Sequence, residues 1–173
     1  MKFIQKISNG IGLLSEWAGR TVMWLLIALI VVIALDVFAR YLFNMPSTWS
    51  FPISYMTGAI LVALGLCYVH LHQGMVRVDV IYTRFSPKTK LLVDIVFAIV
   101  FLLPLAATLA ILFGADTYNA YLTNEKACET TWYPIVWPYK AVVTIGFGLL
   151  FLQGIGTLLK DIAGLTKGGK EPW

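Results

Sequence analysis

The fold is decided by residues 91–115, LLVDIVFAIVFLLPLAATLAILFGA, in which Asp94 is the single charged residue. An α-helix needs about 20 consecutive apolar residues to cross the roughly 30 Å hydrocarbon core of a bilayer. Backbone amide and carbonyl groups find no water in that core, so they must pair within the segment, as they do in a helix. The stretch therefore predicts a transmembrane helix.

Three further stretches have the same character, and they cover residues 21–39, 53–71 and 135–159. Hydrophobic residues make up 59% of the chain and charged residues only 13%, a balance that is untypical of a water-soluble domain. No internal repeat or low-complexity linker divides the sequence. We therefore expect an all-α integral membrane protein, with four transmembrane helices in a single domain over 1–173.

The basic residues predict the orientation. Ten of the 13 lysines and arginines lie before the first stretch, between the second and third, or after the fourth. Because short cytoplasmic loops carry an excess of Lys and Arg, both termini are predicted to be cytoplasmic. The net charge of +4 then reflects topology and contact with anionic membrane lipids, and no nucleic-acid partner is needed to explain it.

The segment before the first stretch has an amphipathic pattern. Apolar residues recur at helical spacing, at Ile4, Ile7, Ile11, Leu14 and Ala18. This pattern predicts an interfacial helix over 2–18, lying along the cytoplasmic surface of the membrane.

Charged residues stand near the ends of the apolar stretches. Asp36 and Arg40 are i,i+4 neighbours, as are Lys90 and Asp94, so each pair can neutralise itself. Lys140 lies less than two turns into the fourth stretch, and we expect its side chain to snorkel to the outer interface. The middle of each stretch then offers no evident site for a coupling ion.

The sequence lacks the residues that several classes of membrane protein need for their chemistry. Within the first stretch, residues 24–35 contain no carboxylate of the kind that a proton-coupled exporter needs. His70 and His72 are about 200° apart around a helix and cannot both ligate one haem. Cys67 and Cys128 fall on opposite sides of the membrane, so they form neither a disulfide nor a redox pair. We predict no catalytic residue, no cofactor and no metal site.

Small residues indicate how the helices pack. Ala106, Ala110 and Gly114 recur every four residues, as do Ala59 and Ala63, which allows close approach of helix backbones.

Two polar or irregular positions lie within the apolar stretches. Pro104 should remove one backbone hydrogen bond from the third helix and kink it. Gln153 is a candidate for a hydrogen bond between helices.

Aromatic residues are concentrated around the two outer connections. They predict an aromatic belt at headgroup level, and they are also compatible with a docking surface for a periplasmic partner. The set comprises Tyr41, Phe43, Trp49, Phe51, Tyr55, Tyr118, Tyr121, Trp132, Tyr133, Trp137 and Tyr139.

Ordered motifs add a family resemblance. The chain resembles the small membrane subunit of tripartite ATP-independent periplasmic (TRAP) transporters, the DctQ-type family. The motifs are DVFARYLFN at 36–44 with Trp49, HQGMVRVDV at 72–80, Ser86-Pro87, WPYK at 137–140 and GFGLLFLQG at 146–154. Glu129 is similar to an acidic position of the family. Phe51-Pro52 and Met75 depart from it, since members often carry an acidic residue and a histidine at these places.

The resemblance implies a division of labour among three proteins. A large membrane subunit moves the substrate, an organic acid by default, and couples it to sodium, while a periplasmic substrate-binding protein delivers that substrate. The small subunit is then a scaffold in a bacterial or archaeal cytoplasmic (inner) membrane. Alternatives are a membrane anchor or assembly subunit of another complex, for example a respiratory one, and a small oligomeric channel or exporter.

Candidate interface residues follow from the resemblance and from position. Arg40, Asn44 and Trp49 are expected at the outer rim, and His72, Arg77 and Asp79 at the turn after the second span. Lys140 is expected to hold a lipid phosphate between subunits. The full set of interface candidates is Arg40, Asn44, Trp49, His72, Arg77, Asp79, Glu129, Trp137 and Lys140.

Overall fold

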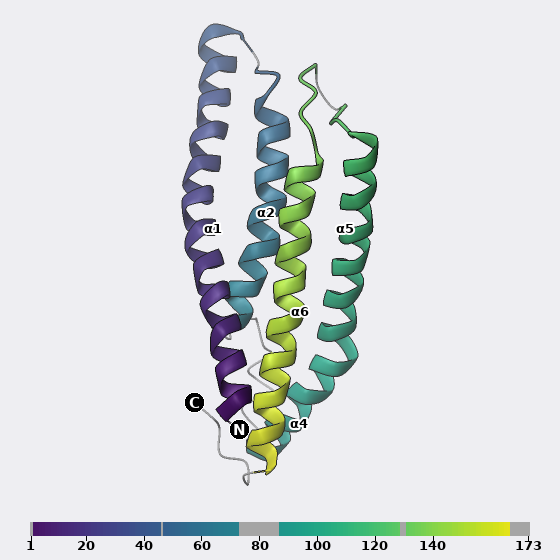
Figure 1. Cartoon of the computed structure of the whole chain (residues 1–173). Coiled ribbons are helices and arrows are strands. Elements are labelled where there is room, and N and C mark those ends of the chain that lie inside the picture. Colours follow the sequence, from purple (N-terminus) through teal and green to yellow (C-terminus); the bar gives the residue numbers. More distant parts are fainter. Residues whose placement is uncertain (1, 46, 73–86, 129–130, 167–173) are drawn as a thin grey trace.

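The computed structural model describes residues 2–45, 47–72, 87–128 and 131–166, and these residues are helical apart from short connections (Figure 1). The elements in chain order are α1 (Lys2–Phe43), α2 (Ser50–Leu71), α4 (Pro87–Phe97), the π-helix η1 (Ala98–Leu102), α5 (Leu103–Thr123) and α6 (Trp137–Thr166). We call the end of the bundle where α1 begins and α6 ends the inner end, and the opposite end the outer end.

Among the residues that the structure describes, four helical segments are long and apolar enough to cross a membrane, as predicted. They are Gly12–Phe43, Ser50–Leu71, Lys88–Thr123 and Trp137–Ile162. The third runs through α4, η1 and α5 without a break. The observed helices are longer than the predicted apolar stretches because the backbone stays helical through the polar residues that flank them.

The N-terminal segment differs from the prediction of a separate interfacial helix. Residues 2–18 are helical, but they belong to α1, one continuous helix of 42 residues. Two contacts join α1 to α2 around Ser15 and Gly19. The hydroxyl of Ser15 lies 3.0 Å from the thiol of Cys67, and the ring of Tyr68 packs directly on the backbone of Gly19.

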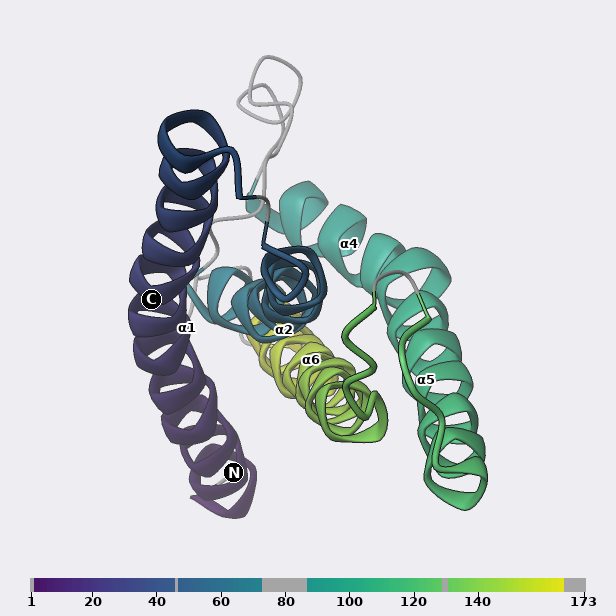
Figure 2. The ribbon, with the colours of Figure 1, turned by 90° about the horizontal axis from the view of Figure 1, so that it is seen from above.

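Helix α6 is the centre of the bundle and packs against α1, α2, α4 and α5. Figure 2 shows it between α2 and α5, with α1 on the far side of α2. One buried cluster consists of Ala63 from α2, Ala106 from α5, and Val143, Phe147 and Leu150 from α6. At Gly146 a Cβ atom would lie 2.9 Å from Ala63, so the glycine permits this close contact between α2 and α6.

Pro104 is preceded by the π-helix η1. At the end of this helix the backbone N–H of Leu103 donates to the carbonyl of Ala98, five residues earlier. Proline lacks an N–H group, and its ring would collide with the carbonyl four residues before it in a regular helix. The wider π-turn relieves that conflict. The chain changes direction between α4 and α5 (Figure 2), so the predicted kink is present.

Candidate functional site

The outer end contains a cluster of three charges around the nearly buried Lys140. The ammonium of Lys140 lies 2.9 Å from a carboxylate oxygen of Asp116 on α5 and 2.9 Å from one of Glu125 in the following connection. The lysine side chain is only 10% exposed, while both carboxylates are about half exposed. The ammonium of Lys140 therefore lies between two carboxylates of the same chain toward the outer end, and its predicted role of holding a lipid phosphate between subunits stays a prediction.

The connection between α5 and α6 places Glu125 beside Lys140. Asn124 ends α5 in the left-handed conformation, with φ of 46°, which turns the chain back. The amide of Val136 then donates to the carbonyl of Glu125 at 3.1 Å, and the amide of Ala127 to that of Pro134 at 3.0 Å. These bonds make a short antiparallel ribbon that holds the glutamate over the start of α6.

Below this cluster, α5 and α6 are joined by hydroxyl groups and rings. The hydroxyls of Thr117 and Thr144 lie 3.0 Å apart. One turn further in, the rings of Phe113 and Phe147 stack with centroids 5.4 Å apart. The pairing of Lys140 with Asp116 is therefore one part of a longer contact between the two helices.

A cavity of about 890 Å³ lies between α2 and α5 at the outer end, with α6 as its floor. Its α2 wall includes Tyr55, Gly58 and Val62, and its floor includes Val143 and Phe147. Asp116, Glu125, Lys126 and Lys140 also line it. The rings of Tyr55 and Tyr139 meet edge to face, with centroids 6.0 Å apart.

The corner between α1 and α2 holds a second polar cluster. Arg40 donates to Asp36 at 2.9 Å, which confirms the predicted i,i+4 pair. Both the backbone N–H and the hydroxyl of Ser47 donate to the other carboxylate oxygen of Asp36. Asn44 has a φ of 50° and follows the end of α1. Trp49, 40% exposed, directly precedes α2.

The inner end joins α1 to α2 through one partly exposed pair. The imidazole of His72 lies 3.5 Å from Glu16, and it stacks on the ring of Tyr68 with centroids 4.3 Å apart. Glu16 also lies 3.9 Å from Arg20. The sequence predicted His72 as an interface residue. It did not identify the two residues that contact His72, which are Glu16 on α1 and Tyr68 on α2.

A smaller cavity of about 330 Å³ lies between α2 and α4 at the inner end, again with α6 as its floor. His70, Asp94 and Asp161 contribute its titratable groups, and Phe101 and Leu105 contribute apolar surface from η1 and α5. Asp161 is buried, with 6% of its surface exposed.

The predicted packing residues all lie near α6. Ala63 and Ala106 are in the core, and Ala59 and Ala110 pack against it. A Cβ atom at Gly114 would meet the methyl group of Thr144 at 3.6 Å. Gln153 is buried in α6, and its hydrogen bond to another helix stays a prediction.

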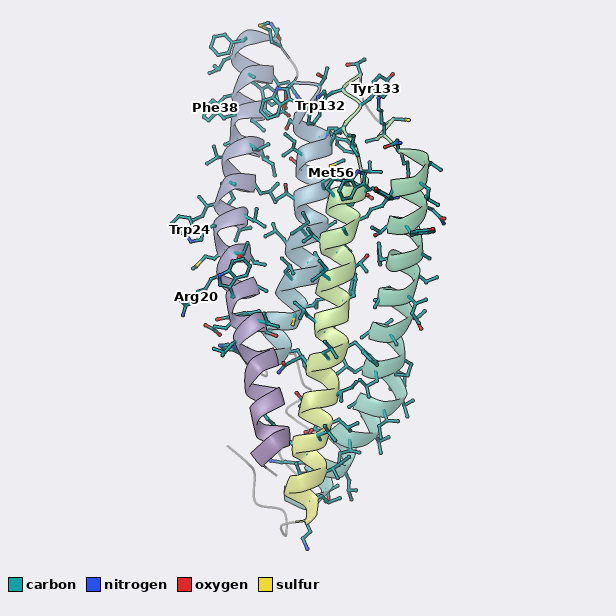
Figure 3. The ribbon with its side chains drawn as sticks, in the orientation of Figure 1. Arg20, Trp24, Phe38, Met56, Trp132 and Tyr133 are labelled. Carbon is teal, nitrogen blue, oxygen red and sulfur yellow. The ribbon has the colours of Figure 1, made fainter. Side chains whose placement is uncertain are left out.

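The aromatic residues of the outer connections gather at one end of the molecule. Figure 3 shows Phe38 on α1 and Trp132 and Tyr133 on the second connection toward this end, whereas Arg20 and Trp24 point away from the bundle lower on α1. Trp137 meets Tyr121 edge to face, with centroids 5.6 Å apart. Arg77, Asp79, Met75 and Glu129 lie outside the described residues, so their predicted roles stay predictions.

No group of three or more His, Cys, Asp or Glu side chains in the described part of the chain is arranged to hold a metal ion. Both cysteines are free thiols: Cys67 is buried and Cys128 is exposed.

The comparisons with known proteins identify one family. A family model described as "Tripartite ATP-independent periplasmic transporters, DctQ component" matches residues 29–164, which is most of the chain. No curated protein and no solved structure gives a significant match. The family is not enzymatic, and membership implies a membrane location and association with a large membrane component and a periplasmic binding component. The chain belongs to the DctQ component family of tripartite ATP-independent periplasmic transporters.

Proposed function

We propose that this chain is the small permease subunit that scaffolds the large membrane component of a TRAP transporter. The complete transporter carries out sodium-driven uptake of an organic acid that the periplasmic binding component delivers. In this proposal the large component moves the substrate and binds sodium, while the small subunit enlarges and anchors its static part in the inner membrane.

The observation that carries this proposal is the apolar centre of the bundle. Alanine, valine, leucine and phenylalanine close the contact between α2, α5 and α6 at Ala63, Ala106, Val143, Phe147 and Leu150. The charged pair of Asp36 and Arg40 and the cluster around Lys140 lie toward the outer end, and the pair of Glu16 and His72 lies toward the inner end. A tightly packed apolar centre suits a rigid support better than a path for ions.

The orientation is part of the proposal. Both termini lie in the cytoplasm, because most of the lysines and arginines flank the inner end of the bundle. The outer end, with Arg40, Asn44, Trp49, Trp137 and the predicted acidic position Glu129, then faces the binding component. The exposed aromatic side chains at this end supply contact area for such a partner.

Reconstitution tests this division of labour. The large component is placed in proteoliposomes with and without the present chain, and sodium-driven uptake is measured with the binding component and a panel of labelled mono- and dicarboxylic acids. We expect uptake only when both membrane components are present. Full uptake by the large component alone would refute the scaffold function, and ion flux through the present chain alone would favour a small channel.

A further inference from the structure

Basic residues about one bilayer apart stand on both α1 and α6. Lys140 and Lys160 are 20 positions apart in one continuous helix, which is about 30 Å at 1.5 Å per residue. Arg20 and Arg40 have the same spacing on α1. The hydrocarbon core of a bilayer is also about 30 Å thick. Each helix therefore carries one basic pair that fits the two membrane interfaces.

The register of α6 against α2 shows that α6 is displaced toward the inner end. Gly146 of α6 lies directly against Ala63 of α2, and the two helices run in the same direction (Figure 1). From this contact Lys140 is six residues, or about 9 Å, toward the outer end. The first residue of α2, Ser50, is 13 residues, or about 20 Å, toward the same end. Helix α2 therefore begins about 10 Å further out than Lys140.

The outer charges of α1 lie at the level where α2 begins. Asp36, which pairs with Arg40, accepts hydrogen bonds from Ser47, just before α2. This pair is therefore also about 10 Å further out than Lys140. Figure 1 shows the stagger, since α1 ends and α2 begins beyond the first turn of α6.

The inner end is offset in the same direction. His72, which pairs with Glu16 of α1, is nine residues, or about 14 Å, inward of Ala63. Lys160 is 14 residues, or about 21 Å, inward of Gly146. The inner basic residue of α6 therefore lies about 7 Å further in than the pair that joins α1 to α2.

An upright bundle would place half-exposed carboxylates at the depth of hydrocarbon. The contact of α1 with α2 at Gly19 makes Lys140 level with Ile30, in the middle of the first apolar stretch. Asp116 and Glu125, whose side chains are 51% and 47% exposed, surround Lys140 and would share that depth. Charged groups near the centre of a bilayer are costly.

We infer that the bundle is inclined in the bilayer, with α6 raised toward the outer side relative to α1. The surface that contacts lipid is then an oblique band, bounded outside by Arg40 and Lys140 and inside by Arg20 and Lys160. Neighbouring helix axes are about 8–10 Å apart, and α2 lies between α1 and α6 (Figure 2). An offset of about 7–10 Å across one to two such spacings corresponds to an inclination of roughly 25–40°.

Depth measurements by electron paramagnetic resonance test the inclination. One nitroxide-labelled cysteine is placed at Ile30 of α1 or at Leu152 of α6 in the full chain, in bilayers of native lipids, with Cys67 and Cys128 replaced by serine. The two side chains are 58% and 47% exposed. An upright bundle separates the labels by about 18 Å in depth, and the inclined bundle by about 8 Å. A difference above about 13 Å overturns the inference.

Two controls accompany the labels. A label at Val37 calibrates the depth scale, because it is seven residues from Ile30 on the same helix and their separation changes little with inclination. The melting temperature of each labelled variant, compared with that of the natural chain, reports that it is folded.

Polarised infrared spectroscopy of the natural chain in oriented bilayers is a second measurement and needs no label. The dichroism of the amide I band gives the mean inclination of the helices from the membrane normal, and we expect at least about 25°. A smaller value overturns the inference even if both labels share one depth, because the bilayer is then thinner beside α6. Neither measurement involves the large component, so both test the inclination separately from the scaffold function.

Discussion

At the outer end of the bundle Lys140 is nearly enclosed between two carboxylates, whereas at the inner end Glu16 and His72 form one pair whose side chains are 35% and 48% exposed. The outer cluster links α5 to α6, and the inner pair links α1 to α2. They differ in what happens when one partner is lost. Loss of Lys140 leaves two carboxylates of like charge that faced one cation, so they repel each other, whereas loss of one partner at the inner end leaves a single half-exposed group that regains solvent or headgroup contacts. The comparison predicts that the α5–α6 link is sensitive to substitution and the α1–α2 charge pair is tolerant.

The largest effect is expected from Lys140→Met. The substitution leaves Asp116 and Glu125 close together without a cation. Removing one partner from a fully buried pair costs about 3–5 kcal/mol, and we expect roughly 2–3 kcal/mol here because both carboxylates are half exposed. The change is measured as a loss of thermal stability in detergent.

Lys140→Arg is the control, because it keeps the positive charge. A Lys140→Met variant as stable as the parent protein would show that the outer cluster contributes no more than an exposed pair, and the contrast between the two ends would disappear.

An intermediate effect is expected from Gly19→Ala, which changes an uncharged contact between α1 and α2. At Gly19 a Cβ atom would lie 2.1 Å from the ring of Tyr68, so Gly19→Ala must push the ring or the helix aside. Overpacking of this kind costs about 1–3 kcal/mol. The loss in free energy of unfolding is measured by thermal unfolding of the variant and of the parent protein.

Gly10→Ala in the same helix is the matched substitution. No atom lies within 4 Å of a Cβ atom at Gly10, so this change should stabilise the helix slightly. Equal melting temperatures for the two alanine variants would mean that Tyr68 does not hold α1 against α2.

The smallest effect is expected from Glu16→Gln, which removes the charge from the inner pair. An exposed ion pair contributes about 0.2–1 kcal/mol, and the stacking of His72 on Tyr68 remains in the variant. Thermal unfolding at low and high salt measures this contribution. A loss as large as that of Lys140→Met would show that the inner pair is enclosed in the membrane complex.

The four spans were predictable because their signal is local. Length and apolar composition decide whether a helix can cross a bilayer, and residues 91–115 meet both conditions without reference to the rest of the chain. The pair of Asp36 and Arg40 was predictable for the same reason, since i,i+4 neighbours meet on any helix. Pro104 likewise predicted a disturbance of the third helix, although only the structure shows a π-turn.

The contacts that depend on tertiary structure were not predictable. Lys140 meets Glu125 only because Asn124 turns the chain back and the backbone of Glu125 is then bonded to that of Val136 at the start of α6. Ser15 and Gly19 of α1 lie against α2 because Cys67 and Tyr68, about 50 positions away, contact them. The hydrogen bond from Ser47 to Asp36 could not be predicted, because the sequence shows Ser47 only as a short polar residue between two helices. In each case the deciding partner is distant in sequence or lies in an irregular segment.

The two thiols give the protein a built-in chemical label for its own orientation. Cys128 is exposed in the connection at the outer end, while Cys67 is buried against Ser15 toward the inner end. A maleimide that cannot cross membranes should modify the natural chain in intact cells at one residue, Cys128, if that end faces the periplasm. Detergent and unfolding should then reveal the second thiol. On inverted vesicles the same maleimide should leave Cys128 unmodified until detergent is added, and neither experiment needs a substitution, tag or fusion.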